Sequence, residues 1–282
     1  MLEVPRSVRL AAWGSAVLAG NARVSVAVRA VMGDDEPHDV IAGPPLDAVV
    51  ESSRSNGTTP LEALLLGLRD RGVRRLRVVL PAPGDVFGLP GPPDFNAAAL
   101  EAGECVLTEP IEEPGLASAG TAIAGPDSRW GLVPVITTFG SVWEPGSMVG
   151  WHVRPIELRG AGQPAGLGEA ERELTQALHL ATDELARLDV ARWRDDAAQR
   201  VEAVRDGAIP AGVLPPAAAA RPVRVLGTAA RVRAIVALAS EDDGAAVTGH
   251  EARRRAETLR DLDAVSRRAV TAAVNAMTEP RA

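Results

Sequence analysis

The chain has 282 residues, a net charge of −7 at neutral pH and 46% hydrophobic residues. This composition supports a sizeable core in one or two domains. All 30 basic residues are arginine, which excludes sites that need a lysine, such as a P-loop or a Schiff base with pyridoxal phosphate. The acidic balance argues against a nucleic-acid partner. Arginine in place of lysine, with many Ala, Gly and Pro residues, is typical of a high-GC bacterial genome.

Cys105 is the single cysteine, so the chain forms no internal disulfide and no cysteine-rich zinc site. Its neighbours are apolar, and we interpret it as a small packed hydrophobe rather than a nucleophile. No two histidines have metal-ligand spacing. We therefore expect no metal and no cofactor, and the lack of disulfides is typical of a reducing compartment.

The N-terminal segment allows two interpretations. Arg6 and Arg9 precede an apolar stretch that weakly resembles a signal peptide. The spacing of Leu10, Trp13 and Val17 instead favours an amphipathic helix, which is the interpretation we adopt. No apolar run approaches the roughly 18–20 residues needed to cross a bilayer, so we expect a cytoplasmic protein without a membrane span.

The first 160 residues show alternating helix and strand patterns. A capping pattern of Thr59, Pro60 and Glu62 marks the clearest helix start, and Gly72 ends that helix. Helices are predicted at 6–19, 25–32, 60–71 and 95–102. Strands are predicted at 38–42, 73–80, 105–107, 130–139 and 149–158. Loops are predicted at 43–58, 81–93 and 109–128.

These patterns predict an α/β domain, 1–160, with a mixed sheet of four or five strands and flanking helices. The helix after Thr59 runs directly into the strand Val73–Leu80, which suggests half of a βαβ unit. The turn-rich stretch Gly140–Gly146 lies between the last two strands and predicts that they are antiparallel.

A linker, Gly160–Gly168, precedes a region with only helical patterns, and we predict a second domain, 167–278, of four or five helices. Val223–Ala239 is nearly all apolar, so we expect it to be the most buried of these helices. Thr248 and Glu251 form a second capping box. Helical stripes contain Leu174, Leu178, Ala181, Leu185 and Leu188, then Val190, Trp193, Ala197, Val201 and Val204, then Leu262, Val265, Ala269, Ala273 and Met277.

The loop after the strand Val73–Leu80 is the best candidate for a ligand site, because ligands of α/β sheets commonly bind beyond the carboxyl ends of strands. It carries Asp85, Asp94 and Asn96, and two carboxylates can act as acid and base when their pKa values differ. The structural alternative is that Asp94 caps the following helix and Asp85 belongs to a turn.

His152 and Arg154 are two residues apart on a predicted strand and therefore share a face. An imidazole beside a guanidinium is suited to a carboxylate or phosphate ligand. The alternative is the solvated face of an edge strand. Surface positions are predicted for His179 and for the run Arg253–Arg255, since consecutive helical residues point in different directions.

No complete catalytic arrangement is visible, so the leading hypothesis is a cytoplasmic, non-catalytic protein that binds a partner protein or a small ligand. The alternative is an enzyme acting on a small anionic metabolite, with its site between the 81–96 loop and the 149–158 strand. Its candidate ligand-binding residues are Asp85, Asp94, Asn96, His152 and Arg154. The sequence leaves the oligomeric state and the identity of the partner open.

Overall fold

The computed structural model describes residues 2–33, 37–110, 129–141, 143–157, 165–187, 195–241 and 248–279. The chain divides into two compact units. One consists of Pro5–Gln163, Gly212–Pro216 and Thr278–Ala282, and the other of Met1–Val4, Pro164–Ala211 and Ala217–Met277. The first contains a five-stranded sheet with helices and the second is helical, so the predicted fold class is confirmed. That residues 1–160 and 167–278 fold independently stays a prediction.

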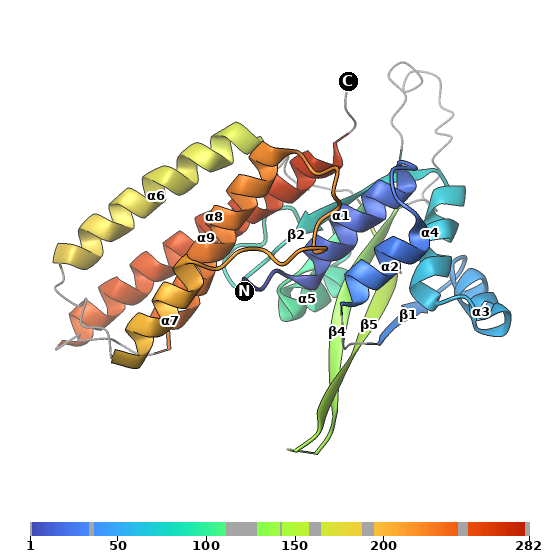
Figure 1. Ribbon diagram of the computed structural model, residues 1–282, viewed down its shortest axis with the longest axis horizontal. Coiled ribbons are helices and arrows are strands. Elements are labelled where there is room, and N and C mark those ends of the chain that lie inside the picture. Colours follow the sequence, from blue (N-terminus) through green and yellow to red (C-terminus); the bar gives the residue numbers. More distant parts are fainter. Residues whose placement is uncertain are drawn as a thin grey trace. The chain divides into compact units, whose positions relative to one another are not determined.

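The α/β unit follows the predicted order of elements with one added helix (Figure 1). Its helices are α1 (Arg6–Leu18), α2 (Val24–Met32), α3 (Asp47–Asn56), α4 (Pro60–Asp70) and α5 (Pro93–Ala102). Its strands are β1 (His38–Ala42), β2 (Val73–Val79), β3 (Cys105–Pro110), β4 (Trp130–Gly140) and β5 (Pro145–Pro155).

The strands lie in the order β1-β5-β4-β3-β2, with β1 parallel to β5 and every other pair antiparallel. The antiparallel pairing of the last two strands is therefore confirmed. The predicted βαβ unit is wrong, because β1 and β2 lie at opposite edges of the sheet and run in opposite directions. The chain passes from β1 to β2 through α3 and α4, and these two strands are neither adjacent nor parallel.

Helix α1 packs against β2 and is buried over most of its length. Leu10, Trp13 and Val17 are all buried, which confirms the predicted apolar face. At Gly14 the helix approaches the sheet closely, since a Cβ there would lie 2.5 Å from Leu76 Cδ1. The Ser15 hydroxyl accepts a hydrogen bond from Leu76 N at 2.9 Å, so α1 also protects the edge of β2.

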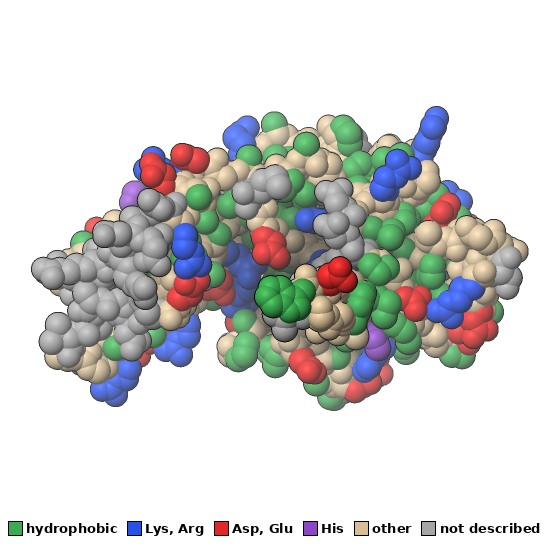
Figure 2. All heavy atoms as spheres, turned by 60° about the horizontal axis from the view of Figure 1, so that its bottom comes forward, with side chains coloured by type: hydrophobic (Ala, Val, Ile, Leu, Met, Phe, Trp, Pro, Cys, Tyr) green, Lys and Arg blue, Asp and Glu red, His purple; other side chains and the backbone are tan. Residues whose placement is uncertain are grey.

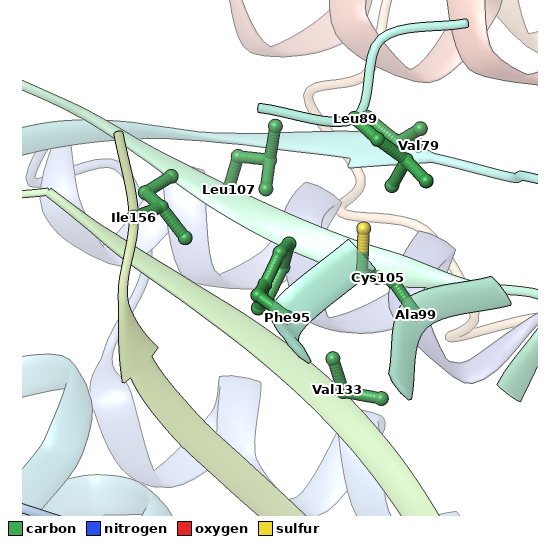
Figure 3. Close-up of a cluster of buried hydrophobic side chains, with 8 residues drawn as sticks. All are labelled: Val79, Leu89, Phe95, Ala99, Cys105, Leu107, Val133 and Ile156. Atoms are coloured by element: carbon green, nitrogen blue, oxygen red, sulfur yellow. The ribbon is translucent and has the colours of Figure 1, made fainter. Parts of the chain in front are cut away.

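Helix α5 packs on the opposite face of the sheet, over β4 and the ends of β2 and β3 (Figure 3). The core there surrounds Phe95, which is fully buried, and also contains Cys105 and Val133. Burial raises the pKa of the Cys105 thiol far above its usual value, which agrees with a packed rather than a nucleophilic cysteine.

The prediction of a loop over residues 43–58 is wrong, because α3 occupies residues 47–56. Its polar composition hides the helix, but Val50 and Ser53 are buried where α3 packs against α4 and β1. Gly57 follows in a left-handed conformation, φ +71°, which is the usual end of a helix. Tertiary contact rather than intrinsic propensity stabilises this helix.

The helical unit contains α6 (Leu167–Arg187), α7 (Asp195–Arg205), α8 (Ala220–Ala239) and α9 (Gly249–Thr278). The capping box is confirmed: Thr248 N donates to Glu251 Oε2 and Glu251 N to Thr248 Oγ1, both at 3.2 Å. Arg253 and Arg254 are exposed as predicted, whereas Arg255 is buried. The predicted loop 109–128, the linker Gly160–Gly168 and residues 188–194 lie largely outside the described residues.

Candidate binding surface

The 81–96 loop begins with a tight turn. The backbone of Ala82 and Asp85 pairs in both directions, with N to O distances of 2.9 and 2.8 Å. Gly84 between them has φ +83°, a conformation that favours glycine. The predicted turn role of Asp85 is therefore present, and its place in a ligand site stays a prediction.

The predicted helix cap at Asp94 is wrong. Helix α5 begins two residues earlier than predicted, at Pro93, with Pro92 as its N-cap and no side-chain cap. This happens because a proline suits the first helical position, where no N–H is needed. Asn96 is used structurally as well, because its Oδ1 accepts a hydrogen bond from Gly91 N at 2.9 Å.

Arg154 and Asp94 are brought together, with Nη1 3.5 Å from Oδ2. Arg154 is paired with Gly131 across β4, and α5 lies over Gly131. His152 lies two residues before Arg154 on the same face, while Trp151 and Val153 are buried on the other face. The shared face predicted for His152 and Arg154 is thus confirmed.

The electrostatics of this face disfavour a charged His152. Burial, followed by the positive charge of Arg154, lowers the pKa of His152 below its usual value. Arg154 already has a carboxylate partner in Asp94, whose side chain is 69% exposed, while that of Arg154 is 39% exposed. The arrangement offers one paired, partly exposed cation and an imidazole of lowered pKa, which is a weak starting point for acid–base catalysis.

A different feature of β4 and β5 was missed by the sequence patterns. The two strands continue past their neighbours as a two-stranded ribbon that projects from the sheet (Figure 1). Strand β3 pairs only with Gly131 and Leu132 of β4, and β1 pairs with β5 only from Val149 onward. We call residues 135–141 and 143–148 the hairpin arm.

The hairpin arm exposes apolar side chains on both faces. Every residue from Val135 to Gly140 is exposed. Phe139 is 55% exposed and Trp143, at the tip, is 91% exposed. Figure 2 looks onto the end of this ribbon, where hydrophobic side chains reach the surface. The other large exposed hydrophobic residues of the arm are Val135, Ile136 and Met148.

The arm is ordered by its own contacts. The turn closes through mutual backbone hydrogen bonds of 3.2 Å between Ser141 and Glu144. The Phe139 ring lies over Gly146 on the opposite strand, where a Cβ would be 2.5 Å from the ring. An aromatic ring over a glycine is a favourable cross-strand arrangement, so the exposed ring has a defined position.

Charge is almost absent from this segment. Between residues 131 and 151 the only charged side chain is Glu144, although 24% of the whole chain is charged. This depletion was the signal in the sequence that could have identified the surface. Protein interface cores show the same depletion of charge together with aromatic residues and methionine.

The other described surfaces give weaker evidence for a binding site. An open groove of about 630 Å³ lies along α6, and its arginine from α8, Arg221, is already paired with Glu171 at 2.9 Å. Among the described residues, no group of three His, Cys, Asp or Glu side chains could hold a metal ion. None of the described helices is long and apolar enough to cross a membrane.

Two family models match the chain in succession. Residues 7–165 match the N-terminal domain of Rv1486c-like proteins, and residues 168–271 match their C-terminal domain. The chain belongs to the Rv1486c-like family. The uncharacterized protein Rv1486c of Mycobacterium tuberculosis (strain ATCC 25618 / H37Rv) is 31% identical over 298 residues, covering 96% of each chain.

Further Rv1486c-like relatives are the uncharacterized protein MT1533 of M. tuberculosis (strain CDC 1551 / Oshkosh), 31% identical, and the uncharacterized protein MAV321 of Mycobacterium avium, 29% identical. Each match covers 96% of both chains. No solved structure matches the chain. These names state no activity, ligand or partner, so membership of the Rv1486c-like family carries no function to this chain.

Proposed function

We propose that this chain is a non-catalytic cytoplasmic protein that binds a partner protein through the hairpin arm. The observation that supports this most directly is the exposed, almost uncharged ribbon ending in Trp143. The single buried cysteine suits a reducing compartment. The scattered structural roles of Asn96 and Asp94 favour binding over catalysis.

Such an arm indicates a partner because exposing its apolar side chains to water raises the free energy of the unbound chain. An isolated two-stranded hairpin is marginally stable in water, and contiguous exposed apolar surface promotes aggregation unless something covers it. A projecting ribbon with a tryptophan at its tip therefore carries a penalty in the free chain. Binding removes the penalty by burying the same side chains, and rigid aromatic residues are the usual anchors of protein interfaces.

The first prediction concerns contact in the native host. A photo-crosslinking amino acid placed at Phe139 should give a crosslinked product of defined mass, because this side chain would lie against the partner. The same amino acid at Leu180, which is 61% exposed on α6, should give none. Crosslinking is read by mass spectrometry. Equal background yields at both positions would show that the arm has no partner.

A second candidate function is the binding of a small anion near Arg154. The observation that favours it is the exposed Asp94–Arg154 ion pair, which places a guanidinium beside the first turn of α5. An anion there would replace the Asp94 carboxylate, and helix N-termini favour negative charge. His152 beside it would act as a hydrogen-bonding group. The proposed residues are Asp85, Asp94, Asn96, His152 and Arg154.

The second prediction separates this candidate from a structural ion pair. Inorganic phosphate at about ten times its Kd should stabilise the native chain by about 1.4 kcal/mol in thermal melts. Asp94→Asn should strengthen the effect, because Arg154 loses its internal competitor, and Arg154→Ala should abolish it. Arg205→Ala, an exposed arginine on α7, is the control. A phosphate effect unchanged in Asp94→Asn and Arg154→Ala would eliminate this candidate.

A further inference from the structure

One edge of the hairpin arm has backbone groups that no described strand pairs with. Strand β4 pairs with β5 along its whole length, but on its other side β3 stops at Leu132. From Val133 to Gly140 no described strand pairs with this edge. In an antiparallel ribbon, every second residue points its amide and carbonyl groups outward. Trp130 N donates to Thr108 Oγ1 of β3, so the outward residues of β4 are the even-numbered ones, and Pro134 among them has no N–H. The row of amides and carbonyls open to an added strand therefore runs from Ile136 to Gly140.

Charge indicates what kind of partner can approach this edge. The whole chain carries a net charge of −7, so two copies repel one another over most of their surfaces. The segment 131–151 contains only Glu144 as a charged residue, and β4 itself has none. Acidic side chains on this edge would attract a basic partner. An acidic partner, such as a second copy of this chain, can approach the edge only because it carries no acidic side chains.

The edge is also complementary to itself. Two β4 strands can pair antiparallel about a two-fold axis, so that each copy presents the same residues to the other. Pairing would place Phe139 and Val135 of the two copies in one continuous apolar surface on a four-stranded ribbon. Because the edge has no charge, no like-charged side chains face each other in any register of this pairing.

The contact area of edge pairing is small. Joining two β4 edges buries the backbone edges and leaves the faces of the ribbon exposed, so the dimer lies below the area of a standard stable interface. The association should therefore be weak and reversible.

We propose that the partner of the hairpin arm is a second copy of this chain, joined by antiparallel pairing of the two β4 edges. This inference rests on the proposed function, which requires only that the arm has some protein partner. It adds a two-fold axis near Thr137 and an oligomeric state that changes with concentration.

The test uses the purified full-length chain in sedimentation velocity from about 1 to about 100 µM, a range that spans micromolar dissociation constants. Wild-type protein should convert from monomer to dimer across this range. Phe139→Glu should raise the dimer Kd at least tenfold, because each carboxylate would replace a ring that packs beside Val135 of the other copy. Leu180→Glu introduces the same charge at an exposed leucine on α6 and should leave Kd unchanged.

Engineered cysteines locate the axis. Cys105 is buried and its pKa is raised, so a cysteine introduced at Thr137 is the only reactive thiol. With a short bis-maleimide, Thr137→Cys should give a covalent dimer, and Ser52→Cys on α3, also exposed, should not. This readout does not depend on a destabilising charge, and circular dichroism melts of Phe139→Glu check that the variant folds.

Each outcome separates the two proposals. A wild-type chain that stays monomeric at the highest concentration, or a dimer that resists Phe139→Glu, overturns pairing through β4. If the same arm crosslinks to a different protein in the host, the second copy is excluded while the proposed function stands. If the arm crosslinks to nothing in the host and the purified chain is monomeric, both proposals fail.

Discussion

Phe95→Ala should lower the free energy of unfolding of the full-length chain by about 3–5 kcal/mol, the usual cost of removing a fully buried aromatic ring. Phe95 is completely buried at the centre of the core between α5 and the sheet, together with Val79, Cys105, Leu107 and Val133. Chemical denaturation with urea measures the loss.

A second substitution makes this prediction specific. A Cβ at Gly131 would overlap the Phe95 ring and lie 2.8 Å from Ile156 Cγ2. Gly131→Ala alone should therefore cost about 1–3 kcal/mol through overpacking. In the double variant the added methyl group occupies part of the space left by the ring, so the two costs should not add. Strict additivity would show that Phe95 and Gly131 are not in contact.

Leu226→Ala should cost about 2–5 kcal/mol, the range for a buried leucine replaced by alanine. Leu226 on α8 is fully buried. Ile235, on the same helix, is only half-buried, so Ile235→Ala should cost clearly less and serves as the matched control. Equal losses at the two positions would contradict the burial of this helix face.

The same pair of variants tests whether the two halves unfold independently. If residues 1–160 and 167–278 are separate domains, Leu226→Ala should lower one of two transitions in calorimetry and Phe95→Ala the other. Fragments 1–160 and 167–282 should then each show a cooperative melt. A single transition lowered by both substitutions, with unfolded fragments, would contradict two-domain folding.

Local signals were sufficient for most individual elements. The capping residues Thr59 and Thr248 mark the starts of α4 and α9, because a side-chain oxygen satisfies a helix amide within the same turn. Gly103 marks the end of α5 for a similar reason, with φ +69°. These interactions involve residues close in the chain, so the sequence alone contains them.

The wrong predictions concern elements whose local sequence preference is overridden by neighbouring residues or elements. Helix α3 exists because Val50 and Ser53 are buried against α4 and β1, and the local sequence reads as a loop. Asp94 was predicted to cap α5 because its side chain is suited to that role, but Pro92 and Pro93 begin the helix two residues earlier. In both cases a neighbouring element or residue competes with the local preference.

By itself, the sequence determined the fold class, the antiparallel pairing of the last two strands and the common face of His152 and Arg154, since these follow from the alternation of residues along one strand. Only the tertiary structure decided the sheet order, the Asp94–Arg154 contact and the exposure of the hairpin arm. A strand that leaves its sheet has the same residue alternation as one that stays in it. Whether Val135 and Phe139 are buried depends on where β3 and β1 end, and that is a property of segments far away in the chain.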